Sequence, residues 1–192
     1  MDAYDLIISR RTVRNFAPDP IDEETLIKLI DAARLAPCGA NLQPLRFLAV
    51  NDSDLKQQVF STLKWAAYIA PHGNPPAGRE PAAYIIILSD QNVGSKTIQM
   101  DVGFAAENLL IAGLCFNVAG CAILSFNPRK IVEIFNLPEH IKPELVLALG
   151  RPGEFPEMVD GRDEVKYWRD EEGRHFTPKK PRDQVMFFNK LG

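Results

Sequence analysis

The chain has 192 residues, with 22 lysines and arginines against 25 aspartates and glutamates, so its formal net charge is −3. Because 46% of the residues are hydrophobic and 24% are charged, the composition is that of a globular protein with a sizeable core; this excludes disordered and fibrous classes and suits a single domain over residues 1–192. The slightly acidic balance argues against nucleic-acid binding, which calls for a basic surface.

Two helices are expected before the first strand. Residues 2–10 carry several apolar side chains and suit a short helix. A second helix begins after Asp22, whose carboxylate can accept from the free N–H groups of the first turn. Pro37 ends this helix, because proline cannot continue the hydrogen-bond ladder.

Two apolar runs in the middle of the chain predict buried strands. Residues 47–50 and 82–88 are short and continuously apolar, as expected of strands that are covered on both faces. A helix at about 52–64 and a loop at 71–78 rich in proline and glycine separate them. In a compact domain such a long loop typically covers a site or is a disordered insert.

The second half predicts two further helices and two further strands. Apolar residues step by three and four from 97 to 117, with others on the remaining faces, so this helix is expected to be buried nearly all round. Residues 118–124 and 145–149 suit strands. Asn127 and the proline after it begin a helix that runs to about residue 135.

The polar and aromatic tail predicts a hairpin from residues 165–168 and 174–177, which are separated by Glu171-Glu172-Gly173. Helices and strands thus mix along the chain without strict alternation. The fold class expected from this order is α+β, with a central mixed sheet flanked by helices.

Neither a membrane span nor a disulfide framework is expected. The longest candidate span, residues 102–116, is too short to cross a membrane and contains Glu107 and Asn108. The start of the chain lacks a signal-peptide pattern, and three cysteines cannot all pair within one chain. A reducing cytoplasm fits these features best.

The common catalytic signatures are absent. The chain has no phosphate-binding loop with Gly-Lys-Ser/Thr, no Gly-x-Gly-x-x-Gly, no Gly-x-Ser-x-Gly and no His-Glu-x-x-His. Its histidines, at positions 72, 140 and 175, lie far apart in the sequence, so no metal site is predicted.

A cluster of arginines and hydroxyls follows the first helix. Arg10, Arg11, Thr12 and Arg14 lie within five residues, and guanidinium forks beside a hydroxyl are suited to binding a phosphate. The alternative is a solvated turn whose arginines pair with nearby aspartates, which is the more frequent role of such a charged run.

A second polar segment joins a helix end to a strand at residues 37–47. Gly39 permits a close backbone approach, and the amides of Asn41 and Gln43 can donate and accept hydrogen bonds. Cys38 has the chemistry of a nucleophile, but no partner histidine stands in a recognisable motif, so packing or contact with a ligand is the expected role.

These two segments together resemble the FMN-dependent nitroreductase family. Arg-Arg-Thr-x-Arg-x-Phe stands about 25 residues before Pro-x-x-x-Asn-x-Gln-Pro-x-x-Phe, as in that family. Three more segments are similar to family motifs in the same order: 101–110 to its central helix, 120–126 to its strand and turn at the flavin ring, and 178–190 to its basic C-terminal segment.

The resemblance implies a nitroreductase-like fold, an intertwined homodimer and FMN at the dimer interface. It assigns the phosphate and ribityl chain to one group of side chains, and the flavin ring to another. The first group is Arg10, Arg11, Thr12, Lys179 and Lys180. In the second group, Arg14 would lie near N1 and O2 of the ring. Leu124 and Ser125 would direct backbone N–H groups towards N5 and O4. The partner subunit would contribute Pro37, Cys38, Gly39 and Asn41.

The activity implied by the resemblance is hydride transfer from NADH or NADPH, through flavin N5, to a small electron acceptor such as a nitroaromatic, a quinone or a flavin, with ping-pong kinetics. No side-chain acid or base is needed. We expect Tyr68 and His72 in the long loop to border the substrate. Alternatives are another flavin reaction on the same fold, such as reductive dehalogenation or flavin fragmentation, and a non-catalytic flavin-binding module.

Overall fold

A four-stranded antiparallel sheet forms the centre of the molecule in a computed structural model that describes residues 2–69 and 73–191. Its strand order is β1-β2-β4-β3, from strands Leu45–Val50 (β1), Ala83–Asp90 (β2), Ala119–Ile123 (β3) and Ile141–Gly150 (β4). The apolar run predicted at 82–88 is the interior strand β2, which is buried from Ala83 to Ser89. The α+β class predicted from the sequence is confirmed.

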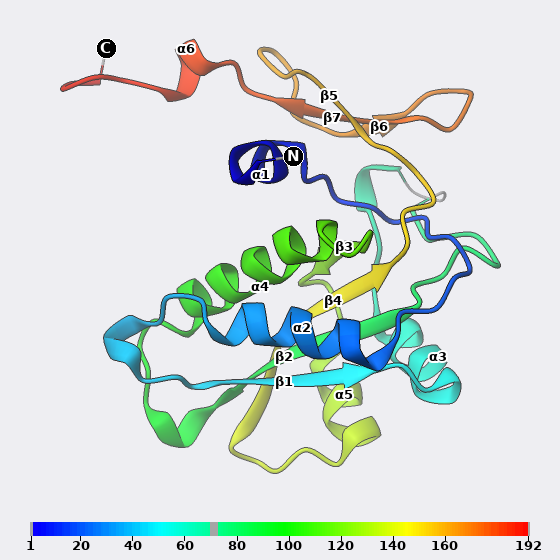
Figure 1. Cartoon of the computed structure of the whole chain (residues 1–192), viewed down its shortest axis with the longest axis vertical. Coiled ribbons are helices and arrows are strands. Elements are labelled where there is room, and N and C mark those ends of the chain that lie inside the picture. The colour runs from blue at the N-terminus through cyan, green and yellow to red at the C-terminus, as the bar shows by residue number, and fades with distance from the viewer. Residues whose placement is uncertain (1, 70–72, 192) are drawn as a thin grey trace.

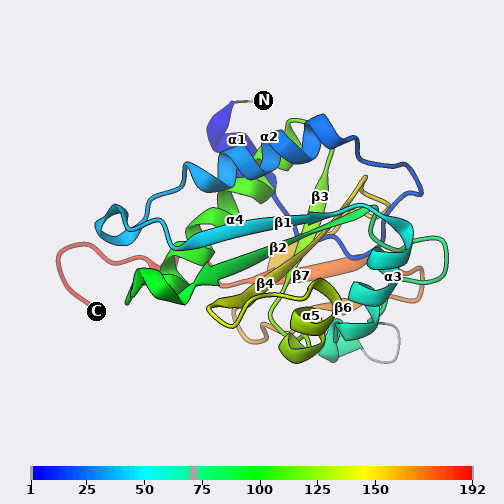
Figure 2. The same cartoon turned by 90° about the horizontal axis from the view of Figure 1, so that it is seen from below.

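Helices cover both faces of this sheet (Figure 2). Helices α2 (Glu23–Arg34) and α4 (Ile98–Leu114) pack on one face with Ile85, Ile87 and Leu147. Helices α3 (Ser53–Thr62) and α5 (Pro128–Phe135) cover the other, and the core there includes Ile86 and Val146. Successive residues of a strand point to opposite faces, which is why this uninterrupted apolar run supplies two cores.

Polar residues begin these helices as the sequence predicts. Asp22 accepts a hydrogen bond from the Thr25 N–H of α2, and this bond lowers the pKa of the Asp22 carboxyl. Asn127 accepts from the Lys130 N–H in the same way, and Pro128 opens α5. Each side chain satisfies an N–H group that has no partner inside its helix.

A second sheet of three short strands lies beside the first helix, α1 (Ala3–Ser9), away from the central sheet (Figure 1). Strands Glu157–Asp160 (β5), Trp168–Arg169 (β6) and His175–Lys179 (β7) have the order β5-β7-β6. The antiparallel pair β6–β7 is the predicted hairpin, whereas β5 pairs parallel to β7 and was not expected. A short helix, α6 (Arg182–Val185), follows.

Three expectations need correction. The central sheet was expected to be mixed, but its four strands pair antiparallel. In the described ranges, a parallel contact with this sheet is the isolated bridge between Thr12 and Gly120 of the edge strand. Strand β4 begins at Ile141, four residues earlier than predicted. Helix α4 is not buried all round in one chain, because Met100, Gly103 and Phe104 are exposed.

Short 3-10 turns complete the chain: η1 (Gly39–Asn41), η2 (Ala67–Ile69) and η3 (Gln91–Val93). None of the helices in the described ranges has the length and apolar character that a membrane span requires.

Candidate cofactor and substrate site

The chain brings four of the predicted phosphate ligands to one pocket. Arg10, Arg11, Thr12 and Lys179 line a pocket of about 310 Å³ between α1 and β7, with Ile7, Ile8, Met158 and Thr177 as the other lining residues. The first three follow the end of α1, whereas Lys179 arrives from the end of β7, almost 170 residues later. No carboxylate is among the residues that line this pocket.

The two arginines of this pocket are held in different ways. Arg10 donates from Nε to Glu107 Oε1 of α4 at 2.8 Å, and its side chain is 24% exposed. Arg11 donates from one guanidinium nitrogen to the backbone oxygens of Ile8 and Arg10, at 2.8 and 2.7 Å. Both guanidinium groups keep further N–H donors, because each has five and uses only one or two.

The second predicted lysine lies in a neighbouring and larger pocket of about 550 Å³. Lys180 and Arg182 line it, together with Arg11 and Lys179, which line both pockets. Asp160 of β5 also borders the larger pocket. Lys179 is therefore better placed than Lys180 to act with Arg10 and Thr12.

Three of the residues predicted near the flavin ring border a third pocket, of about 340 Å³. Arg14, Leu124 and Ser125 border it, and so do Lys64, Trp65, Ala66, Ala67, Cys121, Ala122, Ile123 and Tyr167. The Arg14 guanidinium carbon lies 4.7 Å from the centre of the Tyr167 ring, a cation–π contact. Its charge thus faces a pocket with aromatic walls.

An extended segment connects the pocket lined by Arg10 and Lys179 with this third pocket. The Val13 N–H donates to the Gly120 oxygen at 3.1 Å, and Thr12 bridges Gly120, so residues 10–14 follow the edge strand β3. Four residues of extended chain span at most ~14 Å. A ligand with a phosphate at one end and a planar ring at the other fits this arrangement.

The segment predicted from the partner subunit lies elsewhere. Figure 2 shows the chain between α2 and β1 at one end of the molecule and the chain that follows α3, which carries Trp65, at the other. Pro37 and Cys38 line a separate pocket of about 190 Å³ with Asp101 of α4. One chain therefore does not bring this segment to Arg14.

The buried Asp101 carboxylate anchors this distant segment. Asp101 Oδ1 accepts from the Gly39 N–H at 3.0 Å, and Oδ2 accepts from the Thr97 hydroxyl at 3.1 Å. The three residues Ala40, Asn41 and Gln43 have positive φ values of 48°, 53° and 52°. Such conformations are costly for residues other than glycine, so the surrounding contacts must hold this loop in shape.

One of the two predicted substrate residues can be placed. Tyr68 is 63% exposed, and its ring lies 5.1 Å from the Tyr167 ring that borders the third pocket. His72 lies outside the described residues.

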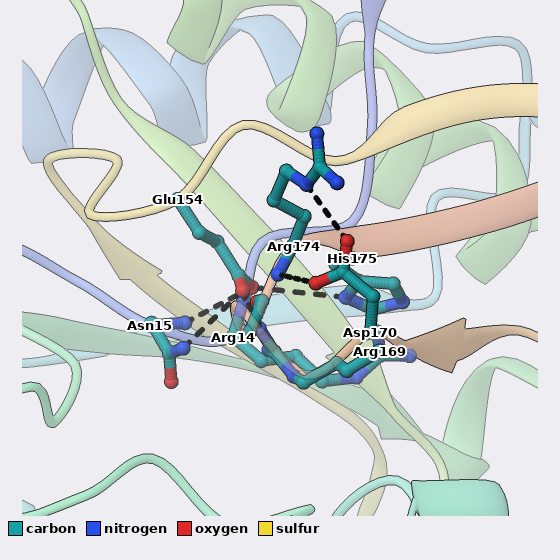
Figure 3. A network of polar contacts seen from close by, with 8 residues as sticks. Arg14, Asn15, Glu154, Arg169, Asp170, Arg174 and His175 are labelled. Carbon is teal, nitrogen blue, oxygen red and sulfur yellow. Dashed lines mark hydrogen bonds and ion pairs between the residues drawn. The ribbon is translucent and has the colours of Figure 1, made fainter.

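Sequence reasoning missed a polar network behind Arg14 (Figure 3). Glu154 Oε1 accepts from the backbone N–H groups of Arg14 and Asn15, at 2.6 and 3.2 Å. Arg169 of β6 lies 2.5 Å from Glu154 Oε2, and His175 Nδ1 lies 4.0 Å from Glu154 Oε1. No local pattern could reveal this network, because its members come from three distant parts of the chain.

His175 is a titratable member of the network, but burial keeps its imidazole uncharged. Its side chain is 1% exposed, and neither ring nitrogen has a hydrogen-bond partner. Burial lowers its pKa from 6.5 to about 4, against the opposing pull of Glu154. The imidazole is therefore neutral near pH 7 and packs against the Tyr167 ring at 5.6 Å.

Comparison with models of known protein families shows to which family this chain belongs. The model of the nitroreductase family matches residues 7–151, which is most of the chain and includes residues 10–14 and the loop that begins at Pro37. The chain belongs to the nitroreductase family.

Curated relatives align with most of this chain, and a solved structure of the family matches all of it. Iodotyrosine deiodinase of Thermotoga neapolitana is 26% identical, over 84% of this chain and 94% of the relative. FMN reductase (NAD(P)H) of Bacillus subtilis is 21% identical, over 77% and 65%. A nitroreductase family protein from Clostridium difficile 630 has the same fold, with a TM-score of 0.76 at 19% identity and full coverage of both chains.

Proposed function

We propose that this nitroreductase family member is an FMN-dependent oxidoreductase that takes a hydride from NADH or NADPH and reduces a small organic acceptor in a second half-reaction. The observation that carries the proposal is the convergence of Arg10, Arg11, Thr12 and Lys179 on one pocket. Three cations and a hydroxyl suit a phosphate monoester, which carries nearly two negative charges at neutral pH.

The residues of this chain fit FMN at both ends. FMN, when bound, would supply the redox chemistry by accepting the hydride at N5 and giving it to the acceptor. The phosphate pocket would hold one end, and the segment from Thr12 to Arg14 along β3 would guide the ribityl chain to the ring. Arg14 would face the N1–O2 edge, where negative charge develops on reduction.

A second subunit completes the proposed site. Pro37, Cys38, Gly39 and Asn41 lie too far from Arg14 in one chain to share its cofactor. A homodimer would deliver this loop to the other subunit's ring. The exposed apolar side chains Met100 and Phe104 of α4 supply surface for such contact.

The same pocket would serve donor and acceptor in turn. Its aromatic lining, from Trp65 and Tyr167, suits planar molecules that stack on a flavin. Arg14 and Lys64, with no carboxylate among the lining residues, suit acceptors that carry negative charge or partial negative charge on oxygen, as nitro and quinone groups do. One open face used twice gives ping-pong kinetics. Nitroaromatics, quinones and free flavins are the acceptors proposed.

An absorption spectrum of the purified protein tests the cofactor, followed by steady-state NAD(P)H oxidation with several acceptors. We expect flavin bands near ~370 and ~450 nm and about one FMN per chain. Initial rates at several donor and acceptor concentrations should give parallel double-reciprocal lines. A protein that remains colourless after incubation with FMN would refute the proposal.

Reductive dehalogenation is the second candidate, because iodotyrosine deiodinase is among the relatives that align with most of this chain. Assays with an iodinated phenol, following iodide release, distinguish it from nitro or quinone reduction. A non-catalytic flavin-binding module would bind FMN without oxidising NAD(P)H under any of these conditions.

A further inference from the structure

A buried carboxylate lies directly behind the arginine that faces the proposed flavin ring. The Glu154 side chain is 9% exposed and accepts the backbone N–H groups of Arg14 and Asn15 on one oxygen. Its other oxygen accepts from the side-chain amide of Asn15 at 3.3 Å. Glu154 therefore fixes the backbone from which the Arg14 side chain leaves for the pocket.

The negative charge of Glu154 is taken up by a different arginine. Arg169, 16% exposed, lies 2.5 Å from Glu154 Oε2. His175 is close, at 4.0 Å, but burial lowers its pKa to about 4, so it is uncharged near pH 7 and cannot neutralise the carboxylate. Burying a carboxylate is costly without a paired cation, and Arg169 is that cation.

The positive charge of Arg14 therefore remains unpaired within the described ranges. In the described part of the chain, no carboxylate lies within 4.0 Å of its guanidinium, which rests instead on the Tyr167 ring at 4.7 Å. Arg10 provides the contrast, since its Nε is paired with Glu107. Among the residues labelled in Figure 3, Glu154 pairs with Arg169 and Asp170 pairs with Arg174. The remaining arginine, Arg14, has no paired carboxylate among them and borders the third pocket.

We propose that Glu154 and Arg169 are positioning residues that set the redox balance of the bound cofactor through Arg14. Glu154 orients Arg14 by accepting hydrogen bonds from the backbone at residues 14 and 15. Arg169 neutralises the Glu154 carboxylate, so that this carboxylate does not offset the positive charge of Arg14 near the flavin. This rests on the proposed function, because it concerns how strongly the site favours reduced, anionic flavin over oxidised flavin. The β6–β7 hairpin, which carries Arg169, thereby becomes part of the electrostatics of the site.

Variants that neutralise one charge at a time test the direction in which the flavin midpoint potential should shift. In Glu154→Gln the unpaired Arg169 adds positive charge behind Arg14, so the flavin midpoint potential should rise. In Arg169→Met the unpaired Glu154 cancels part of the Arg14 charge, so the potential should fall. Each single change should alter the ratio of affinities for reduced and oxidised FMN about tenfold, the effect of one charge at roughly 10 Å with an effective dielectric constant near 20. Tenfold corresponds to about 30 mV for a two-electron couple.

Two further variants separate charge from packing. The double variant Glu154→Gln/Arg169→Met removes one charge of each sign and should return the potential to that of the wild type, and Arg169→Lys should stay close to it. Arg174→Met is the matched control. It removes an arginine from the same hairpin, but one that is 59% exposed and pairs with Asp170 and Glu172.

The outcomes are distinct. Opposite shifts in the two single variants, cancelled in the double variant and absent in Arg174→Met, support the proposal. Shifts of the same sign, or no shift while FMN binds stoichiometrically, overturn it and leave the pair a structural clamp. If Arg169→Met does not fold, the sign of the Glu154→Gln shift decides. A wild-type protein that binds no FMN would refute the proposed function itself.

Discussion

Arg10 Nε and Glu107 Oε1 are 2.8 Å apart, so helix α4 holds one cation of the pocket proposed for the phosphate. The pair joins the end of α1 to the middle of α4 across 97 residues of sequence. Glu107 is half exposed, and exposed ion pairs contribute little to stability. Its main effect is therefore to hold the Arg10 side chain in a fixed orientation over the pocket.

Removing Arg10 should weaken cofactor binding strongly. Arg10→Ala deletes a charge-assisted hydrogen bond to the proposed phosphate, a loss of about 1.5–3 kcal/mol, or roughly ten- to a hundredfold in FMN affinity. Arg14→Ala should instead lower the flavin midpoint potential and slow hydride transfer, while oxidised FMN still binds. Fluorescence titration with FMN and a potential measurement for each variant check both statements. Wild-type affinity and potential in both variants would disprove the assignment of this segment to FMN.

Adding a methyl group at Gly39 should displace the loop that is proposed for the partner's cofactor. A Cβ at this position would lie 2.1 Å from Thr97 Oγ1 and 2.9 Å from Thr97 Cβ, so Gly39→Ala requires movement. We expect a loss of about 1–3 kcal/mol of unfolding free energy, measured in urea, together with weaker FMN binding. Gln58→Ala on α3 is the control, because this exposed helical position lies on the opposite face of the sheet and alanine favours a helix. Equal stability of the two variants would contradict the expectation.

A charge on the exposed face of α4 should separate the subunits. Phe104 is 43% exposed in one chain, and burying an aromatic side chain at an interface contributes about 1.5–3 kcal/mol. Phe104→Asp should therefore raise the dimer dissociation constant at least tenfold and lower FMN content in parallel. Light scattering at several concentrations measures the first effect, and absorbance the second. Gln58→Asp on α3, which packs on the opposite face of the sheet, should leave both unchanged; a wild-type protein that is a flavin-loaded monomer would rule out the shared site.

Truncating Tyr68 should affect acceptors more than the cofactor. Its exposed ring contacts Tyr167 at the edge of the third pocket, and aromatic pairs contribute about 0.5–1.5 kcal/mol beyond their area. Tyr68→Ala should raise KM for aromatic acceptors by roughly two- to tenfold with FMN affinity unchanged, whereas Tyr68→Phe should behave as the wild type. Unchanged kinetics across several acceptors would place this loop outside the substrate site.

His175 should make folding stability depend on pH in the acidic range. Burial lowers its pKa to about 4, whereas in the unfolded chain it stays near 6.5. Between these values the unfolded state binds more protons, so the free energy of unfolding falls as pH decreases from about 6.5 to about 4, by about 3 kcal/mol. His175→Phe should remove this part of the pH dependence.

The difference between wild type and variant is the quantity to measure, because carboxylates titrate over the same range. Urea unfolding at pH 7 and pH 4.5 provides it. His140→Gln, at an exposed position, should retain the full pH dependence of the wild type. At pH 7 His175→Phe should be as stable as the wild type or more stable, since neither ring nitrogen has a hydrogen-bond partner.

Local patterns were sufficient where a short stretch of chain determines its own structure. Asp22 at the start of α2, the proline that opens α5 and the apolar run of β2 are such cases. The cluster of Arg10, Arg11 and Thr12 was visible because its members are adjacent, and Lys179 joined it only through the family resemblance.

The features that the sequence could not predict depend on long-range pairing. Strand β5, Glu157–Asp160, has two apolar residues between two acidic ones and so lacks the alternation of a strand; its pairing with β7 makes it one. Glu154 is one of many glutamates until folding places it under the backbone of Arg14 and against Arg169, about 140 and 15 residues away. Met100 and Phe104 look like core residues in the sequence, because an exposed apolar helix face has the same sequence pattern as a buried one.

The phosphate pocket draws its walls from both ends of the chain, and this has a consequence for synthesis in the cell. Arg10 leaves the ribosome early, but its counterpart Lys179 is made almost 170 residues later, after the whole central sheet. A nascent chain can therefore assemble β1 to β4 before it contains all the residues proposed to bind the cofactor phosphate. Capture of the cofactor would follow completion of β7, and its binding energy would then stabilise finished chains and not partial ones.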